Sequence, residues 1–341
     1  MRSPIAERLT AQALSGPPLK RPEDVAERLL AIQGQDPRGA RLTIRARSSG
    51  LSAADVDRAL TEDRSLLITW LNRGTLHLVR SEDYPLLQAL TTPPLLTSSN
   101  RRLRQEGVSE AAAERAMKTV ESALADAGPL TGEQLKEKLE AARVPVARQA
   151  FIHLMFLAAL RGLVVRGPML GKQHAYALVH DWLGPQRLPE REAALAELAR
   201  RYLIGHGPAD DRDLARWAGL PLRDSRAGLA AIAPQLRERD DGLVELAKSP
   251  SPAPLPEPRL LGAFEPLLLG WASRDEVVGP HKVLVTTNGI FRPFALVDGR
   301  AVATWGLAGG EVTVKPLGKL TKKVAAALET DAKAVIRFLD P

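Results

Sequence analysis

The segment TGEQLKEKLEAARVPVARQAFIHLMFLAALRGLVVRGPMLGKQHAYALV spans residues 131–179 and carries two helical patterns followed by two strand patterns. Its first residue, a threonine, is a favoured helix N-cap, so the first helix is expected to extend to about Arg143. After a Val-Pro turn, an apolar helix is expected over residues 147–161. Strand-like residues at 163–166 and 174–179 then flank a loop that contains glycine and proline.

This order of helix, turn, helix, strand, loop and strand is typical of a winged helix, a DNA-binding helix-turn-helix with an attached β-hairpin. Two further stretches follow the same order of helices before a hairpin, although their sequences are not repeats. In the first, helices are expected at residues 4–15, 22–33, 37–47 and 52–61, and strands at 66–71 and 75–79. In the other, helices are expected at residues 192–204, 209–218 and 222–232, before a hairpin around Asp241-Gly242.

A proline-rich linker, residues 248–258, precedes a change from helical to alternating periodicity. Strands are predicted at residues 282–287, 290–297, 301–307 and 311–317, joined at Asn288-Gly289, Asp298-Gly299 and Gly309-Gly310. They indicate a small antiparallel sheet or barrel that is closed by a C-terminal helix over residues 320–339.

The predicted fold is α+β, mainly α, with tandem winged-helix domains followed by a small antiparallel β-barrel. We expect three winged-helix domains, at residues 1–100, 101–185 and 186–250. The β-barrel with its terminal helix is expected at residues 259–341.

The composition of the 341 residues excludes several classes of protein. The chain has 47 Lys and Arg against 40 Asp and Glu, a net charge of +7, and 45% hydrophobic residues, which argues against a disordered chain and leaves an anionic partner open. It has no cysteine, so disulfides, thiolate metal sites and cysteine nucleophiles are excluded. Charges within the first ten residues and the lack of a long apolar run predict a cytoplasmic protein with no membrane partner, which we expect to be monomeric.

No motif for a metal or cofactor emerges, so we expect none. The segment from Gly167 to Lys172 is one residue short of a phosphate-binding loop and is interpreted as the tip of a hairpin. The six histidines lack the spacing that places two ligands on one metal. Three aspartates, at positions 210, 211 and 213, follow Pro208 and are better explained as residues that offset the helix dipole.

Basic residues form clusters that suggest a nucleic-acid surface. Arg38, Arg41 and Arg45 recur on one helix face, which fits either a track for phosphates or an ordinary solvated face. Two other clusters, one of arginines and one of lysines, lie at positions 101, 102 and 104 and at positions 315, 319, 322 and 323. Clusters in several predicted winged-helix units favour double-stranded DNA as the partner.

The most informative segment is Ile-Gln33-Gly34-Gln35-Asp36-Pro37. Gly34 can end a helix in a left-handed conformation, Asp36 is a good N-cap, and Pro37 suits the first position of the next helix. On such a joint both glutamines can point outward beside the arginines, whereas on a continuous helix they would diverge by about 200°. The alternative is that they are two polar linker residues.

Four motifs resemble the AlkZ/YcaQ superfamily of winged-helix DNA glycosylases, and they span nearly the whole chain. They are the segment from Ile32 to Arg38, TWLNRGTLHLV at residues 69–79, GPA at 207–209 with WAGLP at 217–221, and FEPLLLGW at 264–271. This sequence departs from the family pattern in having Gly34 between the glutamines and Glu265 where aspartate is expected. We assign no role to Glu265 from the sequence.

The resemblance implies three winged-helix units, a β-barrel, and a catalytic Gln-X-Gln motif that falls on Gln33 and Gln35. It implies excision of N7-alkylguanines, including bulky natural-product adducts and interstrand crosslinks. Such a base leaves as a neutral molecule without a general acid, so the amides would position water and stabilise positive charge on the sugar. We see no lysine nucleophile at the motif and expect no Schiff-base step.

Several further residues are candidates for DNA contact. Arg73 either contacts DNA or belongs to a packed wing, and His77 is included although a structural histidine is the more common case. Asn288 and Arg292 lie on a hairpin that either enters a minor groove or is an ordinary barrel hairpin with inward Phe residues.

The sequence therefore predicts a monofunctional DNA glycosylase of base excision repair, acting on alkylation damage in duplex DNA without metal or cofactor. General repair and self-resistance in an antibiotic producer both stay open. The alternative is a non-catalytic winged-helix regulator or damage binder, which has no need of the glutamine pair. A small-molecule enzyme finds no supporting nucleotide-binding or triad motif.

Overall fold

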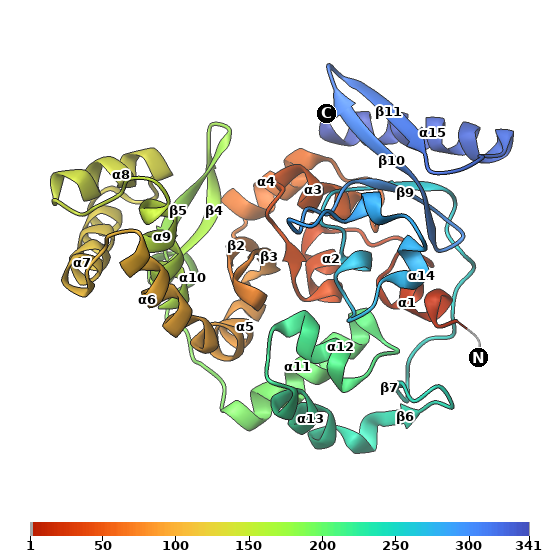
Figure 1. Ribbon diagram of the computed structural model, residues 1–341, viewed down its shortest axis with the longest axis horizontal. Coiled ribbons are helices and arrows are strands. Elements are labelled where there is room, and N and C mark those ends of the chain that lie inside the picture. The colour runs from red at the N-terminus through yellow and green to blue at the C-terminus, as the bar shows by residue number, and fades with distance from the viewer. Residues whose placement is uncertain (1–2, 341) are drawn as a thin grey trace. The chain divides into compact units, whose positions relative to one another are not determined.

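A computed structural model describes residues 3–340, which form two compact units (Figure 1). One unit comprises residues 3–56 and 192–340, and the other comprises residues 57–191. The expected first domain, residues 1–100, is therefore divided between the two units. The winged-helix identity of the expected domains stays a prediction, whereas the order of helices followed by a hairpin is present in the chain.

The unit of residues 57–191 is a helical layer on an antiparallel sheet, with α4 entering it at its N-terminal end. Its helices are α4 (Ala53–Thr61), α5 (Tyr84–Thr91), α6 (Leu96–Gln105), α7 (Glu110–Ala127), α8 (Gly132–Ala141), α9 (Ala150–Leu160) and α10 (Val179–Leu183). Its strands are β2 (Leu66–Trp70), β3 (Leu76–Arg80), β4 (Val164–Leu170) and β5 (Gln173–Leu178), in the order β3-β2-β4-β5. The predicted β4–β5 hairpin is present, but its turn is confined to Gly171 and Lys172, because β4 continues through residues 167–170, where a loop was predicted.

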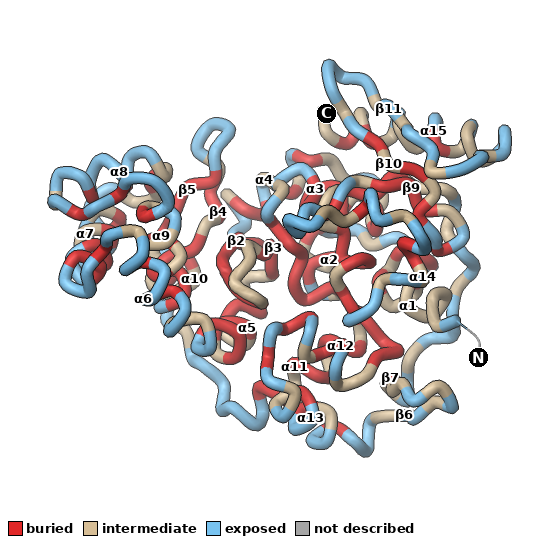
Figure 2. The backbone as a smooth tube through the Cα atoms, viewed as in Figure 1, coloured by how far each residue is buried: buried red, intermediate tan, exposed pale blue. Residues whose placement is uncertain are grey.

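Local chemistry explains where the helices of this unit begin. The Thr131 hydroxyl accepts from the Gln134 amide, and the Gln134 side chain accepts from the Thr131 amide, which forms a capping box at α8. Apolar residues of α7, α8 and α9 pack with Trp70 and Tyr176 in one hydrophobic core. The tip of the β4–β5 hairpin lies outside this core and is exposed (Figure 2).

The unit of residues 3–56 and 192–340 holds the remaining elements. Its helices are α1 (Ile5–Ala11), α2 (Pro22–Leu29), α3 (Pro37–Arg45), α11 (Arg191–His206), α12 (Asp211–Ala218), α13 (Leu222–Ala231), α14 (Asp275–Val278) and α15 (Lys322–Leu339). Its strands are β1 (Ile32–Gln33), β6 (Leu236–Glu238), β7 (Val244–Leu246), β8 (Arg259–Leu261), β9 (Phe294–Val297), β10 (Arg300–Ala308) and β11 (Glu311–Pro316). The predicted hairpin around Asp241-Gly242 is present as β6 and β7.

The expected C-terminal β-barrel is wrong, because the sheet is open. Its order is β11-β10-β9-β8, and β11 and β8 form its two edges. Residues 282–284 form a 3-10 turn where a strand was predicted, while β8 was not predicted. Helix α15 packs against the edge strands β8 and β11, so the predicted C-terminal helix covers the sheet, but the sheet does not close on itself.

Helix α3 packs backbone to backbone against the chain that follows β8. A Cβ atom at Gly39 would lie 2.4 Å from the Ala263 carbonyl oxygen, and one at Gly262 would lie 2.9 Å from the Gly39 Cα. Only glycine permits this approach, and it fixes the N-terminal half of α3 on the C-terminal sheet. Among residues 3–340, no helix is both long enough and apolar enough to cross a membrane.

Candidate functional site

The Gln-Gly-Gln segment lies on a joint between α2 and α3. Helix α2 ends at Leu29, and Leu30 takes the positive φ of 61° that was expected at Gly34. Gln33 lies in the short strand β1. Asp36 caps α3 as predicted, since its Oδ1 accepts from the Gly39 amide at 2.6 Å. Pro37 occupies the first turn of α3, also as predicted.

The two glutamines differ in exposure. Gln35 is exposed, but Gln33 is only 6% exposed, so the expectation that both lie in solvent is wrong for Gln33. The Gln33 Nε2 donates to the Gln35 Oε1 at 2.5 Å. A buried amide therefore holds an exposed one in place, and Gln35 is the member of the pair that solvent can reach.

The predicted arginine stripe on α3 is not a solvated face. Arg41 is 8% exposed and donates to the Pro37 carbonyl. Arg45 donates to both Asp331 carboxylate oxygens at 2.9 Å and to the Leu260 carbonyl at 2.8 Å. Only Arg38 is exposed, and its Nη1 contacts the Leu307 carbonyl at 3.4 Å. The face packs on the C-terminal sheet and α15, which sequence periodicity alone cannot distinguish from a solvated face.

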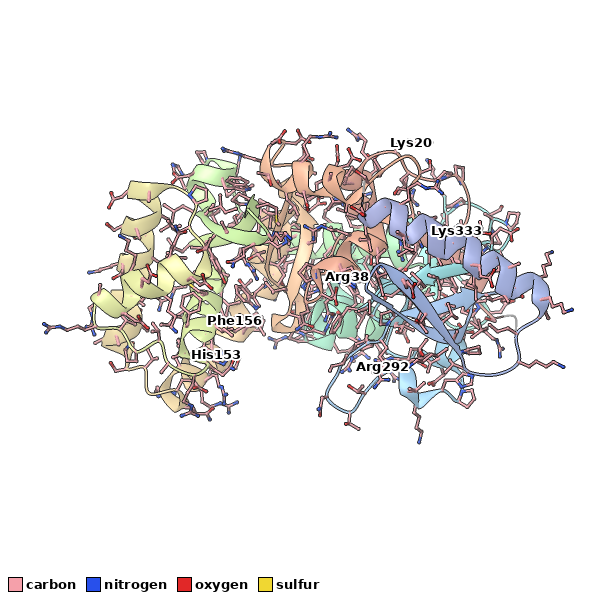
Figure 3. All side chains as sticks on the ribbon, turned by 90° about the horizontal axis from the view of Figure 1, so that it is seen from above. Lys20, Arg38, His153, Phe156, Arg292 and Lys333 are labelled. Atoms are coloured by element: carbon pink, nitrogen blue, oxygen red, sulfur yellow. The ribbon has the colours of Figure 1, made fainter. Side chains whose placement is uncertain are left out.

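Strands β10 and β11 carry an open groove of about 410 Å³ next to Arg38. Arg292 and Lys315 line it, together with Trp305 and Leu307 of β10. Arg38 and Arg292 both lie near the strands of the C-terminal sheet (Figure 3). Thus two of the predicted DNA-contact residues, and one lysine of the C-terminal cluster, come together within this unit.

Asn288 lies at the exposed tip of a tight loop, next to Gly289 with φ of 72°. The loop closes through an isolated bridge between Val285 and Phe291. Phe291 is buried and packs against Phe264 at a centroid distance of 5.9 Å, as in the inward-Phe alternative. Ile290, by contrast, is 51% exposed, so the loop presents an apolar side chain to solvent.

Arg73 and His77 lie in the other unit, on and after the turn between β2 and β3. Arg73 lies half-buried at the turn and has a positive φ of 59°. His77 is 2% exposed, and its Nδ1 donates to the Thr75 carbonyl at 2.9 Å. Burial, aided by the Arg73 charge, lowers the pKa of His77 to about 3. The candidate DNA contact at His77 is therefore corrected to a buried, neutral structural histidine.

We predict that protonation of two buried histidines destabilises the protein in acid. Burial also lowers the pKa of His206 to about 3, where its Nδ1 donates to the Tyr202 carbonyl. In the unfolded chain both histidines titrate near 6.5, so the unfolded state binds more protons as the pH falls from about 6.5 towards 3. Stability is full above pH 6.5 and falls through this window.

Urea unfolding from about pH 8 to about pH 4 measures this fall in stability. The slope against pH should be shallower in the double variant His77→Gln/His206→Gln. An identical slope in variant and wild type would contradict the assignment.

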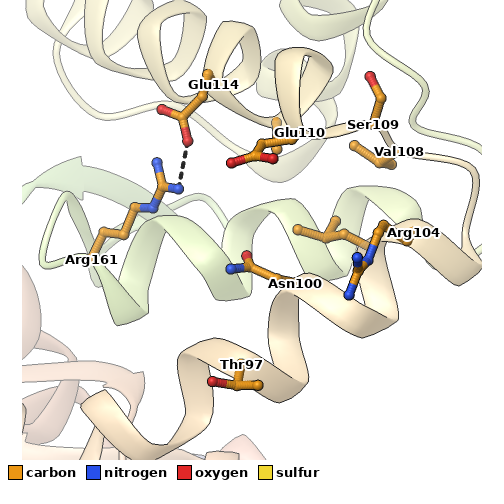
Figure 4. A pocket seen from close by; sticks show the side chains of 10 residues that line it. Thr97, Asn100, Arg104, Val108, Ser109, Glu110, Glu114 and Arg161 are labelled. Atoms are coloured by element: carbon orange, nitrogen blue, oxygen red, sulfur yellow. Dashed lines mark hydrogen bonds and ion pairs between the residues drawn. The ribbon is translucent and has the colours of Figure 1, made fainter.

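The arginine cluster at positions 101, 102 and 104 is only partly available. Arg102 bonds His153 and pairs with Glu106 at 2.8 Å. Arg104 lines a pocket of about 280 Å³ between α6 and α7, where Arg161 pairs with Glu114 (Figure 4). Within residues 3–340 no group of three or more His, Asp or Glu is placed to hold a metal ion. Asp210 and Asp213 form a capping box at α12, as their helix-dipole interpretation requires.

Comparison with known proteins places the chain in a family. A family model described as DNA glycosylase AlkZ-like matches residues 26–338. The protein named interstrand DNA cross-link repair glycosylase of Streptomyces sahachiroi is 29% identical over 359 aligned positions, which cover 98% of this chain and 95% of that protein. The solved structure of Streptomyces sahachiroi DNA glycosylase AlkZ matches with a TM-score of 0.80 and 26% identity, over 98% of this chain and 95% of that one. The chain therefore belongs to the AlkZ-like DNA glycosylase family.

Proposed function

We propose that this DNA glycosylase excises N7-alkylguanines from duplex DNA, with Gln33 and Gln35 as its catalytic pair. The observation that carries the proposal is the hydrogen bond from buried Gln33 to exposed Gln35 at the start of α3. An exposed amide with a fixed orientation can meet a nucleotide and a water molecule without rearranging, which is the condition for electrostatic and positional catalysis.

Hydrolysis of the N-glycosidic bond of an N7-alkylguanine is a reaction that glutamine side chains can assist. Alkylation at N7 makes guanine cationic, so cleavage of the N-glycosidic bond releases a neutral base and leaves positive charge on the sugar. The Gln35 carbonyl oxygen keeps acceptor capacity beyond the bond from Gln33, because an amide oxygen has two lone pairs. It can therefore accept from the attacking water or face the cationic sugar. No lysine lies between Leu30 and Arg38, so the proposed reaction is hydrolysis without a covalent intermediate.

We extend the proposal to interstrand crosslinks and other bulky adducts. The name of the Streptomyces sahachiroi relative states crosslink repair, and that relative matches 98% of this chain. An exposed Gln35 also fits a large lesion, since a bulky base does not have to enter an enclosed cavity to reach it.

The groove on β10 and β11 is the proposed track for the DNA backbone in this unit. Arg38, Arg292 and Lys315 supply positive charge there, which favours the phosphates of DNA. Asn288 and Ile290 extend the same surface at the exposed loop, where an apolar side chain can enter a minor groove. Arg73, half-buried in the other unit, is retained as a proposed contact.

Replacing Arg38, Arg292 and Lys315 together with glutamine should reduce the salt dependence of binding to undamaged duplex. Each lost phosphate contact lowers the slope of log K against log salt by about 0.9, so the slope should fall by between two and three. Fluorescence anisotropy across a salt series measures it. The matched control, Arg41→Gln, removes an arginine that the structure buries, and its slope should stay near wild type after folding is verified. The groove assignment would be wrong if the control changed the slope and the triple variant did not.

The function itself is tested with three duplexes, carrying N7-methylguanine, a bulky N7 adduct or an N7-linked crosslink. Abasic sites are revealed by alkaline cleavage after single-turnover incubation, and unhooking of the crosslink is followed on a denaturing gel. Release of N7-alkylguanine with strand breaks only after alkali is the expected result. Tight binding without release from any of the three would favour the damage-binding alternative.

A further inference from the structure

A pocket of about 230 Å³ lies at the C-terminal end of α3, away from the glutamine pair. Its walls come from the loop after α1, from residues 45–48, from the first residue of β8 and from α15. An adjoining pocket of about 280 Å³ shares Arg45 and Ser48 and adds Arg337 of α15. Both belong to the unit of residues 3–56 and 192–340.

The charges around this pocket do not cancel. Arg47 is fully buried against Glu265, and Arg45 is paired with Asp331 through both guanidinium nitrogens. Within residues 3–340 no ion pair joins Arg259 to a carboxylate, so three guanidinium groups share the two carboxylates of Asp331 and Glu265. Burial lowers the pKa of Arg259, and the charges of Arg45 and Arg47 act in the same direction against the opposing effects of Asp331 and Glu265. One positive charge is therefore left over in a half-enclosed space.

Hydrogen-bond donors are also left over. Among the described residues, Arg259 makes one hydrogen bond, from its Nη1 to the Ala46 carbonyl. The Arg45 Nε is buried without a partner. A pocket with surplus donors and surplus positive charge matches a ligand that offers only acceptors and negative charge.

We propose that this pocket binds a tetrahedral oxyanion of the phosphate class through Arg259 and Arg45. A guanidinium presents several donors in a plane, which matches phosphate oxygens better than a single ammonium does. The phosphate group comes either from free inorganic phosphate or from the backbone of DNA. The competing explanation is that the arginines only tie the C-terminal end of α3 to β8 and α15, with the helix dipole offsetting part of the charge.

Isothermal titration of the full-length protein with inorganic phosphate, in chloride buffer at constant ionic strength, tests the site. We expect a dissociation constant in the millimolar range for wild type. Arg259→Gln should weaken binding about tenfold or more, since hydrogen bonds to a charged group are lost. The matched control, Arg212→Gln, removes one exposed charge from α12 of the same unit and should bind phosphate like wild type.

Asp331→Asn provides a second test, because it should strengthen phosphate binding where Arg259→Gln weakens it. This test remains usable even if Arg259→Gln folds poorly. It frees Arg45 from its carboxylate, so phosphate should bind more tightly and raise the melting temperature more than in wild type. Competition separates the two sources: duplex DNA displaces phosphate if a backbone phosphate enters the pocket, and does not if the ligand is free phosphate. No phosphate binding by wild type, or equal binding by wild type and Arg259→Gln, would overturn the proposal.

Discussion

Replacing Gln35 with alanine should lower the single-turnover rate of N7-methylguanine excision by about a hundredfold, while unfolding by urea stays near wild type. A positioned polar group at the reacting centre contributes about 2 to 4 kcal/mol to the barrier. Gln35 is exposed, so its truncation opens no cavity in the core, and the loss of one acceptor for the Gln33 amide costs about 1 kcal/mol. Rapid-quench measurements with excess enzyme give the rate of the chemical step.

The Gln33→Ala variant should lose both activity and stability. Gln33 is buried and holds the Gln35 carbonyl oxygen, so its loss leaves a cavity and frees Gln35 to rotate. The contrast between the two variants distinguishes a positioning residue from one that meets the substrate. Equal rates for wild type and both alanine variants would show that the glutamines are not catalytic.

Gln35→Asp is the sharper variant at this site. It shortens the side chain but supplies a carboxylate that attracts positive charge on the sugar, so it should retain more activity than Gln35→Ala. Asn at the same position has the shorter side chain without the charge and is the matched control. Activity in Gln35→Asp no higher than in Gln35→Asn would mean that charge at this position contributes nothing.

The joint that carries these glutamines was predictable because its signals are local. Asp36 followed by Pro37 specifies a helix start through one side-chain bond and one fixed dihedral, and both are found where they were predicted. The positive φ at Leu30 was not predictable, since it is imposed by the path between α2 and β1 rather than by the residue's own preference. The burial of Gln33 depends on the same path.

The errors share a physical cause, which is that a periodic pattern does not identify its partner. The spacing of the arginines on α3 correctly placed them on one helix face. That face packs against α15 and β8, where Arg45 pairs with Asp331, 286 residues further along the chain. The alternating C-terminal strands predicted an antiparallel sheet with a C-terminal helix against it, and both are present, but the pattern could not tell an open sheet from a closed barrel. Long-range pairing of this kind leaves no local trace in the sequence.

Glu265 shows the same limit. The sequence indicated no role for it, yet it is fully buried. Its Oε1 accepts a hydrogen bond from Arg47 Nη2 at 2.5 Å. Arg47 also donates to the backbone and side-chain oxygens of Gln12 and to the Thr43 carbonyl. Glu265 in turn accepts from the Leu267 amide. This network ties the C-terminal end of α3 to the FEPLLLGW motif, and its members lie far apart in the chain.

Replacing Arg47 with methionine should destabilise the protein by about 3 to 5 kcal/mol, because it leaves the Glu265 carboxylate buried without its partner. The exposed pair of Arg226 and Asp211, in the same unit, is the matched control, and Arg226→Met should cost less than about 1 kcal/mol. Urea unfolding of both variants gives the comparison.

The double variant Arg47→Met/Glu265→Leu decides what the buried pair contributes. Since an apolar pair of similar size carries no desolvation cost, it should recover most of the stability lost in Arg47→Met. If the double variant is no more stable than the single one, the loss comes from the bonds that Arg47 makes to Gln12 and Thr43 rather than from an unpaired carboxylate. In that case the role of Glu265 is to cap the turn at Leu267, and Glu265→Gln, which keeps an acceptor oxygen, should then unfold like wild type.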